Sequence, residues 1–134
     1  MANDFGVAVD VAVAPDAAWA LAGDPGRVGE WFTPITECAM NGDIRRVRMT
    51  GGVVLVERIV DHDDSGRSYS YSVLEGVPGL TSHRATLRVE EAPAGSRVIW
   101  RQTATSEDPD YDIEARLRGV MTAGLESLRE RLEA

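Results

Sequence analysis

The chain has 134 residues, a formal net charge of −8 and one cysteine, and all 14 of its basic residues are arginine. A chain of this length fits a single domain, residues 1–134, and can bury a core without a disulfide or a metal ion. Its acidity disfavours nucleic acid as a partner, because phosphate backbones are repelled. Two histidines and one cysteine predict neither a zinc site nor an intramolecular disulfide, and we expect no cofactor. Cys38 is interpreted as a small, buried or half-buried apolar residue.

The N-terminal residues 5–14 alternate between two faces, which is typical of a half-buried strand. The larger apolar side chains share one face: Phe5, Val7, Val9, Val11 and Val13. This stretch has neither a basic start nor a continuous apolar run, so it does not resemble a signal peptide, and we find no segment long enough to span a membrane. We therefore expect a cytoplasmic protein, either a monomer or a homodimer.

Two short helices are predicted after this strand. Pro15 and Asp16 favour the start of the first helix, which we expect to end near Gly23. Asp24 and Pro25 give a second start signal. The second helix is expected to carry Val28, Trp31 and Phe32 and to end at residues 33–34.

From Ile35 to about Thr105 the sequence alternates between apolar runs and turn signals, which indicates about six more strands. The turn signals lie at residues 41–43, 51–52, 63–66, 76–79 and 93–95. The clearest strands are 53–61, 68–75, 82–91 and 96–105. We interpret the acidic run at Asp61–Asp64 as a solvated turn, not as a metal site.

The last segment changes to a helical period. One stripe of a helix of about six turns is formed by Ile113, Leu117, Val120, Met121, Leu125, Leu128 and Leu132. Acids and Pro109 are expected in its first turn. Close packing is the preferred interpretation of Gly119 and Gly124, and room for a ligand is the alternative. The predicted class is α+β, a curved antiparallel sheet of six to seven strands packed on a long C-terminal helix.

Several segments carry a family resemblance when they are taken in order. They are VAVAPDAAWAL (11–21), GDPGRVGEWF (23–32), GDIRRVRM (42–49), VERIVDHDDSGRSYSYSVLEG (56–76), HRATLRVE (83–90) and SRVIWRQT (96–103). Together they resemble the START/Bet v 1-like (SRPBCC) superfamily, most closely its polyketide cyclase/dehydrase-like branch, over nearly the whole chain. The resemblance implies a helix-grip fold with a cavity between the sheet and the C-terminal helix. It implies no single activity, because the superfamily includes both aromatase/cyclases and carriers of lipids or hormones.

Polar residues on the inward strand faces are the candidate ligand-binding groups. His83 shares its face with the apolar residues of its strand, and either a solvated strand end or a pocket histidine fits this position. Glu75 is a candidate for the rim. The remaining candidates are Tyr69, Tyr71, Trp100, Gln102 and Met121. Residues 76–80 are a candidate lip of the entrance, although most such loops are simple connections.

Glu57 interrupts an apolar run, and parity alone leaves its direction open because both faces are apolar. A buried glutamate requires a cation or hydrogen bonds. Arg45 or Arg46 is placed to supply the cation, and the choice depends on the hairpin register. A structural ion pair is the preferred role for Glu57, and a general base is the alternative.

The leading functional hypothesis is the binding of a small hydrophobic molecule, polyketide-like, aromatic or lipid-like, in an internal cavity. The second hypothesis is a cyclase or dehydratase that acts on a poly-carbonyl substrate, with Glu57, His83 and Tyr71 as candidate catalytic residues. The third is a non-catalytic protein-association module whose cavity is filled by its own side chains.

Overall fold

The computed structural model describes residues 3–134, and seven strands, two α-helices and a short 3-10 helix make up this part of the chain. In chain order the elements are β1 (Asn3–Val11), α1 (Pro15–Ala22), η1 (Pro25–Glu30), β2 (Ile35–Asn41), β3 (Ile44–Met49), β4 (Val54–Asp63), β5 (Ser68–Glu75), β6 (Leu80–Ala92), β7 (Gly95–Ser106) and α2 (Ile113–Glu133).

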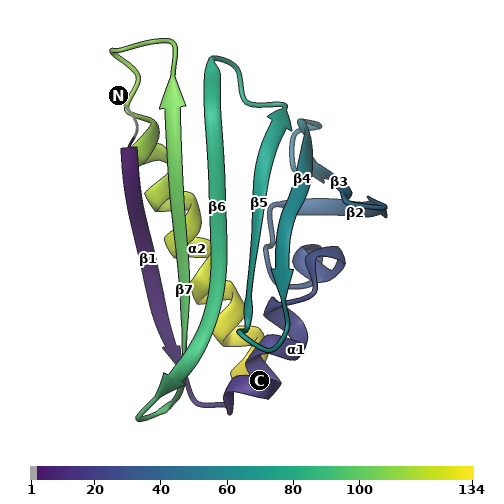
Figure 1. Ribbon diagram of the computed structural model, residues 1–134, viewed down its shortest axis with the longest axis vertical. Coiled ribbons are helices and arrows are strands. Elements are labelled where there is room, and N and C mark those ends of the chain that lie inside the picture. Colours follow the sequence, from purple (N-terminus) through teal and green to yellow (C-terminus); the bar gives the residue numbers. More distant parts are fainter. Residues whose placement is uncertain (1–2) are drawn as a thin grey trace.

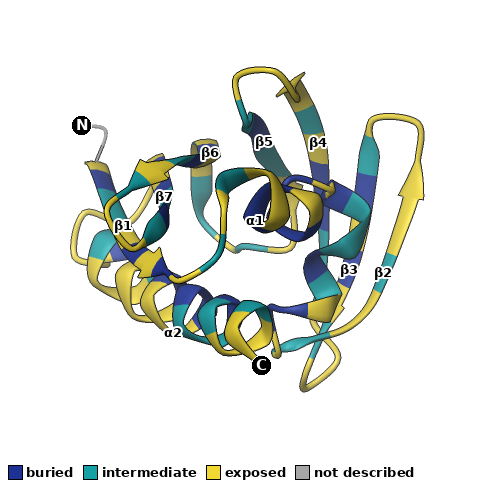
Figure 2. Ribbon diagram, turned by 90° about the horizontal axis from the view of Figure 1, so that it is seen from below, coloured by how far each residue is buried: buried dark blue, intermediate teal, exposed yellow. Residues whose placement is uncertain are grey.

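The strands form one sheet in the order β1-β7-β6-β5-β4-β3-β2, and every neighbouring pair is antiparallel. Figure 1 shows α2 running diagonally behind this sheet. In the view from below, the sheet curves over α2 and α1 lies at one end between the two layers (Figure 2). The predicted α+β helix-grip fold is confirmed.

The core forms where the apolar strand faces meet the helical stripe. On β7, Val98, Trp100, Gln102 and Ala104 are buried on the inner face, as the alternation predicts. On α2, the fully buried members of the stripe are Ile113, Met121, Leu125 and Leu128. Buried residues line the inner surfaces of both layers in Figure 2. This packing fixes which strand faces look toward α2.

The helix boundaries differ in detail from the prediction. The second short helix is a 3-10 helix that ends at Glu30, so Trp31 and Phe32 lie beyond it, although both are buried. Its start agrees, because the side chain of Asp24 accepts a hydrogen bond from the N–H of Gly26. Helix α2 begins one residue after its cap, Asp112, which accepts from the N–H of Ala115. The prediction for Pro109 is wrong, because this residue lies in the preceding turn and not in the first turn of the helix.

The two helical glycines of α2 have different surroundings. A Cβ atom at Gly124 would lie 2.7 Å from the ring of Phe32 and 3.2 Å from that of Trp100, so close packing is confirmed there. A Cβ at Gly119 would meet nothing within 4 Å. Gly124 therefore lets α2 approach the wall of the core, whereas Gly119 has no packing role.

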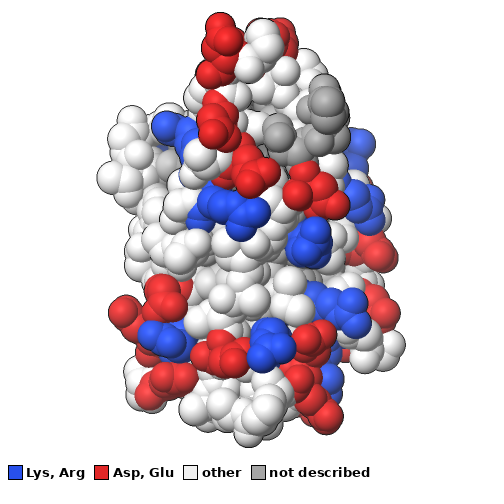
Figure 3. Space-filling model, turned by 90° about the vertical axis from the view of Figure 1, so that its left-hand side faces the viewer, with Lys and Arg blue, Asp and Glu red and all other residues white. Residues whose placement is uncertain are grey.

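Charged side chains cover the outside of the molecule. Figure 3 shows acidic and basic groups interspersed on the side nearest β1. Pairs such as Arg101 with Asp4 and Arg97 with Asp10 are exposed, and such pairs contribute about 0–1 kcal/mol each. Within residues 3–134, no helix has the length and apolar character needed to cross a membrane.

Candidate ligand-binding site

A cavity of about 120 Å³ lies between the sheet and α2. Its walls are mainly apolar and come from η1, the segment after it, the six strands β2 to β7, the β5–β6 loop and α2. The apolar lining residues are Val28, Phe32, Ile35, Val47, Met49, Leu55, Val73, Val77, Leu80, Trp100, Ile113, Leu117, Val120 and Met121. Val77 and Leu80 belong to the predicted lip at residues 76–80, and both border the cavity.

Five polar side chains also line this cavity, one from each of five neighbouring strands. In sheet order they are Arg45 on β3, Glu57 on β4, Tyr71 on β5, His83 on β6 and Gln102 on β7. The strand register explains this arrangement, because Arg45 is directly opposite Glu57, and Ala85 of β6 is opposite both Tyr71 and Gln102. The concave face therefore carries a polar band across an otherwise apolar wall.

Arg45 and Glu57 form a buried ion pair. Arg45 is 2% exposed and Glu57 is 6% exposed, and Nε of Arg45 donates to Oε1 of Glu57 at 2.8 Å. Nη1 of Arg45 donates to the carbonyl oxygen of Pro25 at 3.0 Å and to the hydroxyl of Tyr69 at 3.2 Å. Its guanidinium also lies over the ring of Tyr71, 4.8 Å from the centroid. The register thus selects Arg45, and not the exposed Arg46, as the partner of Glu57.

The groups around Arg45 and Glu57 keep Arg45 protonated and leave Glu57 as its counter-ion. Burial disfavours the charged guanidinium of Arg45, but its contacts with Tyr69, Glu57 and Tyr71 more than offset that effect, and its pKa lies above the ordinary value. Burial raises the pKa of Tyr69 and raises that of Tyr71 even further, so both hydroxyls are neutral at pH 7. Glu57 therefore supplies the negative charge that balances Arg45.

His83 is fixed as a neutral imidazole by two hydrogen bonds. The β5–β6 ladder ends at Tyr71 opposite Ala85, and beyond it Nδ1 of His83 accepts from the backbone N–H of Val73 at 3.1 Å. Because Nδ1 is an acceptor, the ring proton resides on Nε2, which donates to Oε1 of Gln102 at 2.7 Å. Burial lowers the pKa of His83, which also favours the neutral ring. His83 is therefore a half-buried cavity residue and a bridge between two diverging strand ends.

Trp100 and Tyr71 form a further hydrogen-bonded pair in the cavity wall. Nε1 of Trp100 donates to the hydroxyl oxygen of Tyr71 at 3.2 Å. Trp100 also contacts Trp31 and Phe32 edge to face, with ring centroids 5.9 Å apart in each case. The aromatic cluster holds Trp100 at the cavity wall opposite Met121 of α2.

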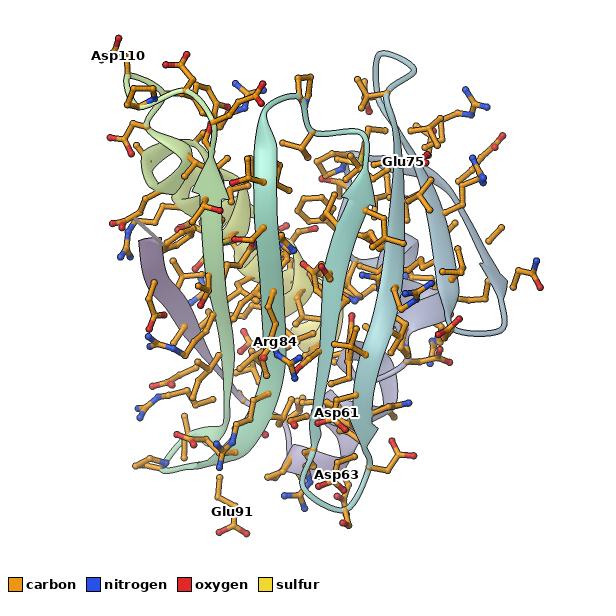
Figure 4. The ribbon with its side chains drawn as sticks, turned by 45° about the horizontal axis from the view of Figure 1, so that its top comes forward. Asp61, Asp63, Glu75, Arg84, Glu91 and Asp110 are labelled. Atoms are coloured by element: carbon orange, nitrogen blue, oxygen red, sulfur yellow. The ribbon has the colours of Figure 1, made fainter. Side chains whose placement is uncertain are left out.

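Two of the candidate residues lie outside the cavity lining. Glu75 is exposed at the end of β5 and is not among the lining residues (Figure 4), so the predicted ligand contact of its carboxylate is not supported. Tyr69 is 1% exposed and does not line the cavity. Its hydroxyl accepts a hydrogen bond from Arg45, which does line it. The other candidates, Tyr71, His83, Trp100, Gln102 and Met121, all border the cavity, as does Glu57.

The acidic run Asp61–Asp64 was expected in a turn, but β4 extends to Asp63, and the turn begins at Asp64, which accepts a hydrogen bond from Nε1 of Trp19. Asp63 accepts from the N–H of Gly66 and from the hydroxyl of Ser65, and the Gly66 bond lowers its pKa. Within residues 3–134, no group of three or more His, Cys, Asp or Glu side chains has a metal-binding arrangement. Cys38 is half-buried, and burial raises the pKa of its thiol, which keeps it protonated.

The sequence alone did not identify Arg45 as part of the lining. The sequence does contain a sign of this role: Arg45 is two residues before Val47 in the same strand, so both side chains lie on the same, inward face of the sheet. The apolar walls from η1 and β3 were also missed. Phe32 was assigned to a helix, and its place in the wall follows from the chain turning after Glu30.

The model of the family described as "Polyketide cyclase / dehydrase and lipid transport" matches residues 4–133. The chain belongs to this family. Both the predicted branch and the SRPBCC assignment are thereby confirmed. Among curated proteins, none matches the chain.

Solved structures share the fold over almost their entire length. An uncharacterized protein from Bacillus thuringiensis is 23% identical, with a TM-score of 0.90 over 97% of this chain and 98% of that one. The Zhui aromatase/cyclase from a Streptomyces species is 16% identical, with a TM-score of 0.83 over 99% and 94%. A major latex-like protein from Panax ginseng is 14% identical, with a TM-score of 0.83 over 97% of both chains. At these identities the likeness establishes the fold alone.

Proposed function

We propose that the chain binds a small hydrophobic molecule in the cavity between the sheet and α2. The supporting observation is that the cavity has apolar walls and that its polar side chains are already paired with one another. The pairs are Arg45 with Glu57, Trp100 with Tyr71, and His83 with Gln102. Apolar walls provide affinity, and a few fixed polar groups set orientation. Pairing also holds each polar group in place before a ligand arrives.

The size of the cavity limits what fits without movement. Its volume of about 120 Å³ is close to that of the engineered apolar cavity of about 150 Å³ that binds benzene. Drug-sized ligands occupy pockets of about 300–1,000 Å³. A single ring therefore fits the structure as it stands. A larger ligand requires the half-buried Val77, Leu80 and Leu117 to move outward.

The test combines native mass spectrometry of the purified protein with a thermal-shift screen. The screen uses toluene, phenol and indole as single- and double-ring probes. A ligand at 100 times its Kd stabilises the folded state by about 2.7 kcal/mol, which is measurable as a rise in Tm. Saturable stabilisation by at least one probe supports the proposal. No co-purified small molecule and no shift with any probe would overturn it.

A matched pair of variants on α2 locates the binding. Leu117 lines the cavity, whereas Thr122 is an exposed residue outside the lining. Leu117→Trp is expected to fill the entrance and abolish the ligand-dependent rise in Tm. Thr122→Trp adds the same side chain to the outer face and is expected to leave the rise unchanged. Equal responses of the two variants would place the binding elsewhere.

One observation favours catalysis as a second candidate function. Oε2 of Glu57 has no hydrogen-bond donor within residues 3–134, and Oε1 of the same carboxylate is bound by the guanidinium of Arg45. The Tyr71 hydroxyl belongs to the same cavity lining. A carboxylate base in a cavity that also holds hydrogen-bond donors suits enolisation of a poly-carbonyl compound, as in a cyclase or dehydratase. His83 is less suited to be the base, because its Nδ1 lone pair is occupied by the Val73 N–H. Turnover of a β-diketone that Glu57→Gln abolishes would support this candidate, and turnover unchanged in that variant would exclude it.

A further inference from the structure

The charges that face the cavity cancel. Of the residues that line it, Arg45 carries a positive charge and Glu57 a negative charge, and their nearest atoms are 2.8 Å apart. His83 is held neutral by the N–H of Val73, and the Tyr71 hydroxyl is protonated. The site is therefore electrically neutral, in contrast to the net charge of −8 of the whole chain.

Hydrogen-bonding atoms nevertheless remain available at this site. Within the described part of the chain, Nη2 of Arg45, Oε2 of Glu57 and Nε2 of Gln102 make no hydrogen bond. Within residues 3–134, Nε1 of Trp31 is the only fully buried side-chain polar atom that lacks a hydrogen-bond partner. The three unpaired atoms named above are therefore not fully buried. All three side chains line the cavity, which is where a ligand would meet their unpaired atoms.

The free atoms are two donors and one acceptor. The hydrogen bond with His83 sets the orientation of the Gln102 amide, because the Nε2–H of His83 requires Oε1 as its acceptor and turns the NH₂ group away. The Tyr71 oxygen accepts from Trp100, which leaves its own proton as a further donor. A ligand group that combines a carbonyl oxygen with an N–H or O–H satisfies both kinds of atom. A carboxylate offers acceptors only and leaves Oε2 of Glu57 facing a second negative charge.

We propose that the Arg45–Glu57 pair makes this cavity select neutral ligands that carry an adjacent acceptor and donor, such as carboxamides, over carboxylates or amidinium cations of the same shape. This inference rests on the proposed binding function. Arg45 alone would favour an acid, and Glu57 cancels that preference. Glu57 is therefore the residue that determines ligand charge.

Three isosteres test this proposal in the unaltered protein. Benzamide, benzoate and benzamidine share one ring and a planar three-atom head, and at pH 7.5 they are neutral, anionic and cationic. We expect benzamide to bind at least tenfold more tightly than either ion in titrations followed by the Trp100 indole N–H resonance. If benzamidine binds most tightly, the negative net charge of the whole chain determines the preference. If benzoate binds most tightly, Glu57 does not compensate the charge of Arg45. Either result would overturn the proposal.

Two variants assign the selectivity to the pair. Glu57→Gln removes the balancing charge at nearly constant size, and the benzamide-to-benzoate affinity ratio is expected to fall at least tenfold. Glu75→Gln makes the same charge change at an exposed carboxylate outside the lining, and its ratio should equal that of the unaltered protein. An unchanged ratio in Glu57→Gln would refute the assignment. Should this variant fail to fold, the ranking of the three isosteres on the unaltered protein still decides the proposal.

Toluene separates failure of this inference from failure of the proposed function. If toluene binds in the cavity but the three isosteres do not differ, the selectivity is refuted and the hydrophobic binding function remains. If neither toluene nor any isostere binds, both proposals are refuted.

Discussion

Removing one partner of the Arg45–Glu57 pair is expected to cost far more stability than removing both. Arg45→Met deletes three hydrogen bonds and leaves the Glu57 carboxylate, 6% exposed, without its cation. An uncompensated buried charge of this kind typically costs about 3–5 kcal/mol. Arg45→Met/Glu57→Leu removes both charges and leaves apolar side chains of similar length facing the core.

The magnitude follows from the burial of the two groups. Domains of this size have a free energy of unfolding of about 5–15 kcal/mol, so the single variants should still be folded enough to measure. Replacing both members of a buried pair with apolar residues is often neutral or stabilising. The carbonyl of Pro25 and the hydroxyl of Tyr69 lose a donor in both Arg45 variants, so we expect a residual cost of about 1–3 kcal/mol in the double variant.

Urea unfolding followed by tryptophan fluorescence measures this cycle. The double variant should be more stable than Arg45→Met, and the coupling between the two sites should exceed about 2 kcal/mol. The control cycle uses the exposed pair Arg101 and Asp4, whose coupling is expected to be about 0.2–1 kcal/mol. Additive effects at Arg45 and Glu57 would contradict a buried, mutually dependent pair.

Three further predictions concern the core, the pH dependence and the helix start. Gly124→Ala should lower the free energy of unfolding by about 1–3 kcal/mol, because its Cβ meets Phe32, whereas Gly119→Ala should raise it by up to about 1 kcal/mol. Similar changes in urea unfolding for both variants would contradict the packing at Gly124. Because the pKa of His83 is lower in the folded state, the unfolded chain binds more protons below pH 6.5. The contribution of His83 to the free energy of unfolding is therefore complete above pH 6.5 and is lost as the pH falls toward its folded-state pKa. His83→Gln should make the free energy of unfolding depend less steeply on pH between pH 7 and 5, and an unchanged pH dependence would refute the assignment. Asp112→Ala should cost about 1 kcal/mol in urea unfolding by removing the cap of α2, and no change would indicate that solvent replaces the cap.

The two-residue alternation of apolar side chains in strands and their helical repeat in the C-terminal segment were sufficient to predict most of the fold. The alternation along 68–75 and 96–105 identified the inner faces, and the stripe of the C-terminal segment identified the face of α2 that packs on the sheet. Each of these patterns depends on one side of an element being buried. The start of η1 was predicted by Asp24, but its end was not, because the bend after Glu30 depends on packing of Trp31 and Phe32 in the core.

The polar band was predicted only in part, because its partners are set by register. Both faces of residues 53–59 are apolar, so alternation gave no direction for Glu57, and the choice between Arg45 and Arg46 required the β3–β4 pairing. The contact of His83 with Val73 arises where the β5–β6 ladder ends, and no local sequence signal marks that point. Tyr69 and Glu75 share the inward parity of Tyr71 but differ in depth, which alternation does not encode.

The most direct test of the central claim is to locate a bound ligand in a crystal. Crystals soaked with 4-bromophenol would reveal the ring by the anomalous signal of bromine. The account predicts a bromine peak inside the cavity beside Trp100 and Met121, with the hydroxyl toward Arg45 and Glu57. A peak confined to the outer surface, or no peak after soaking at saturation, would contradict a ligand-binding cavity between the sheet and α2.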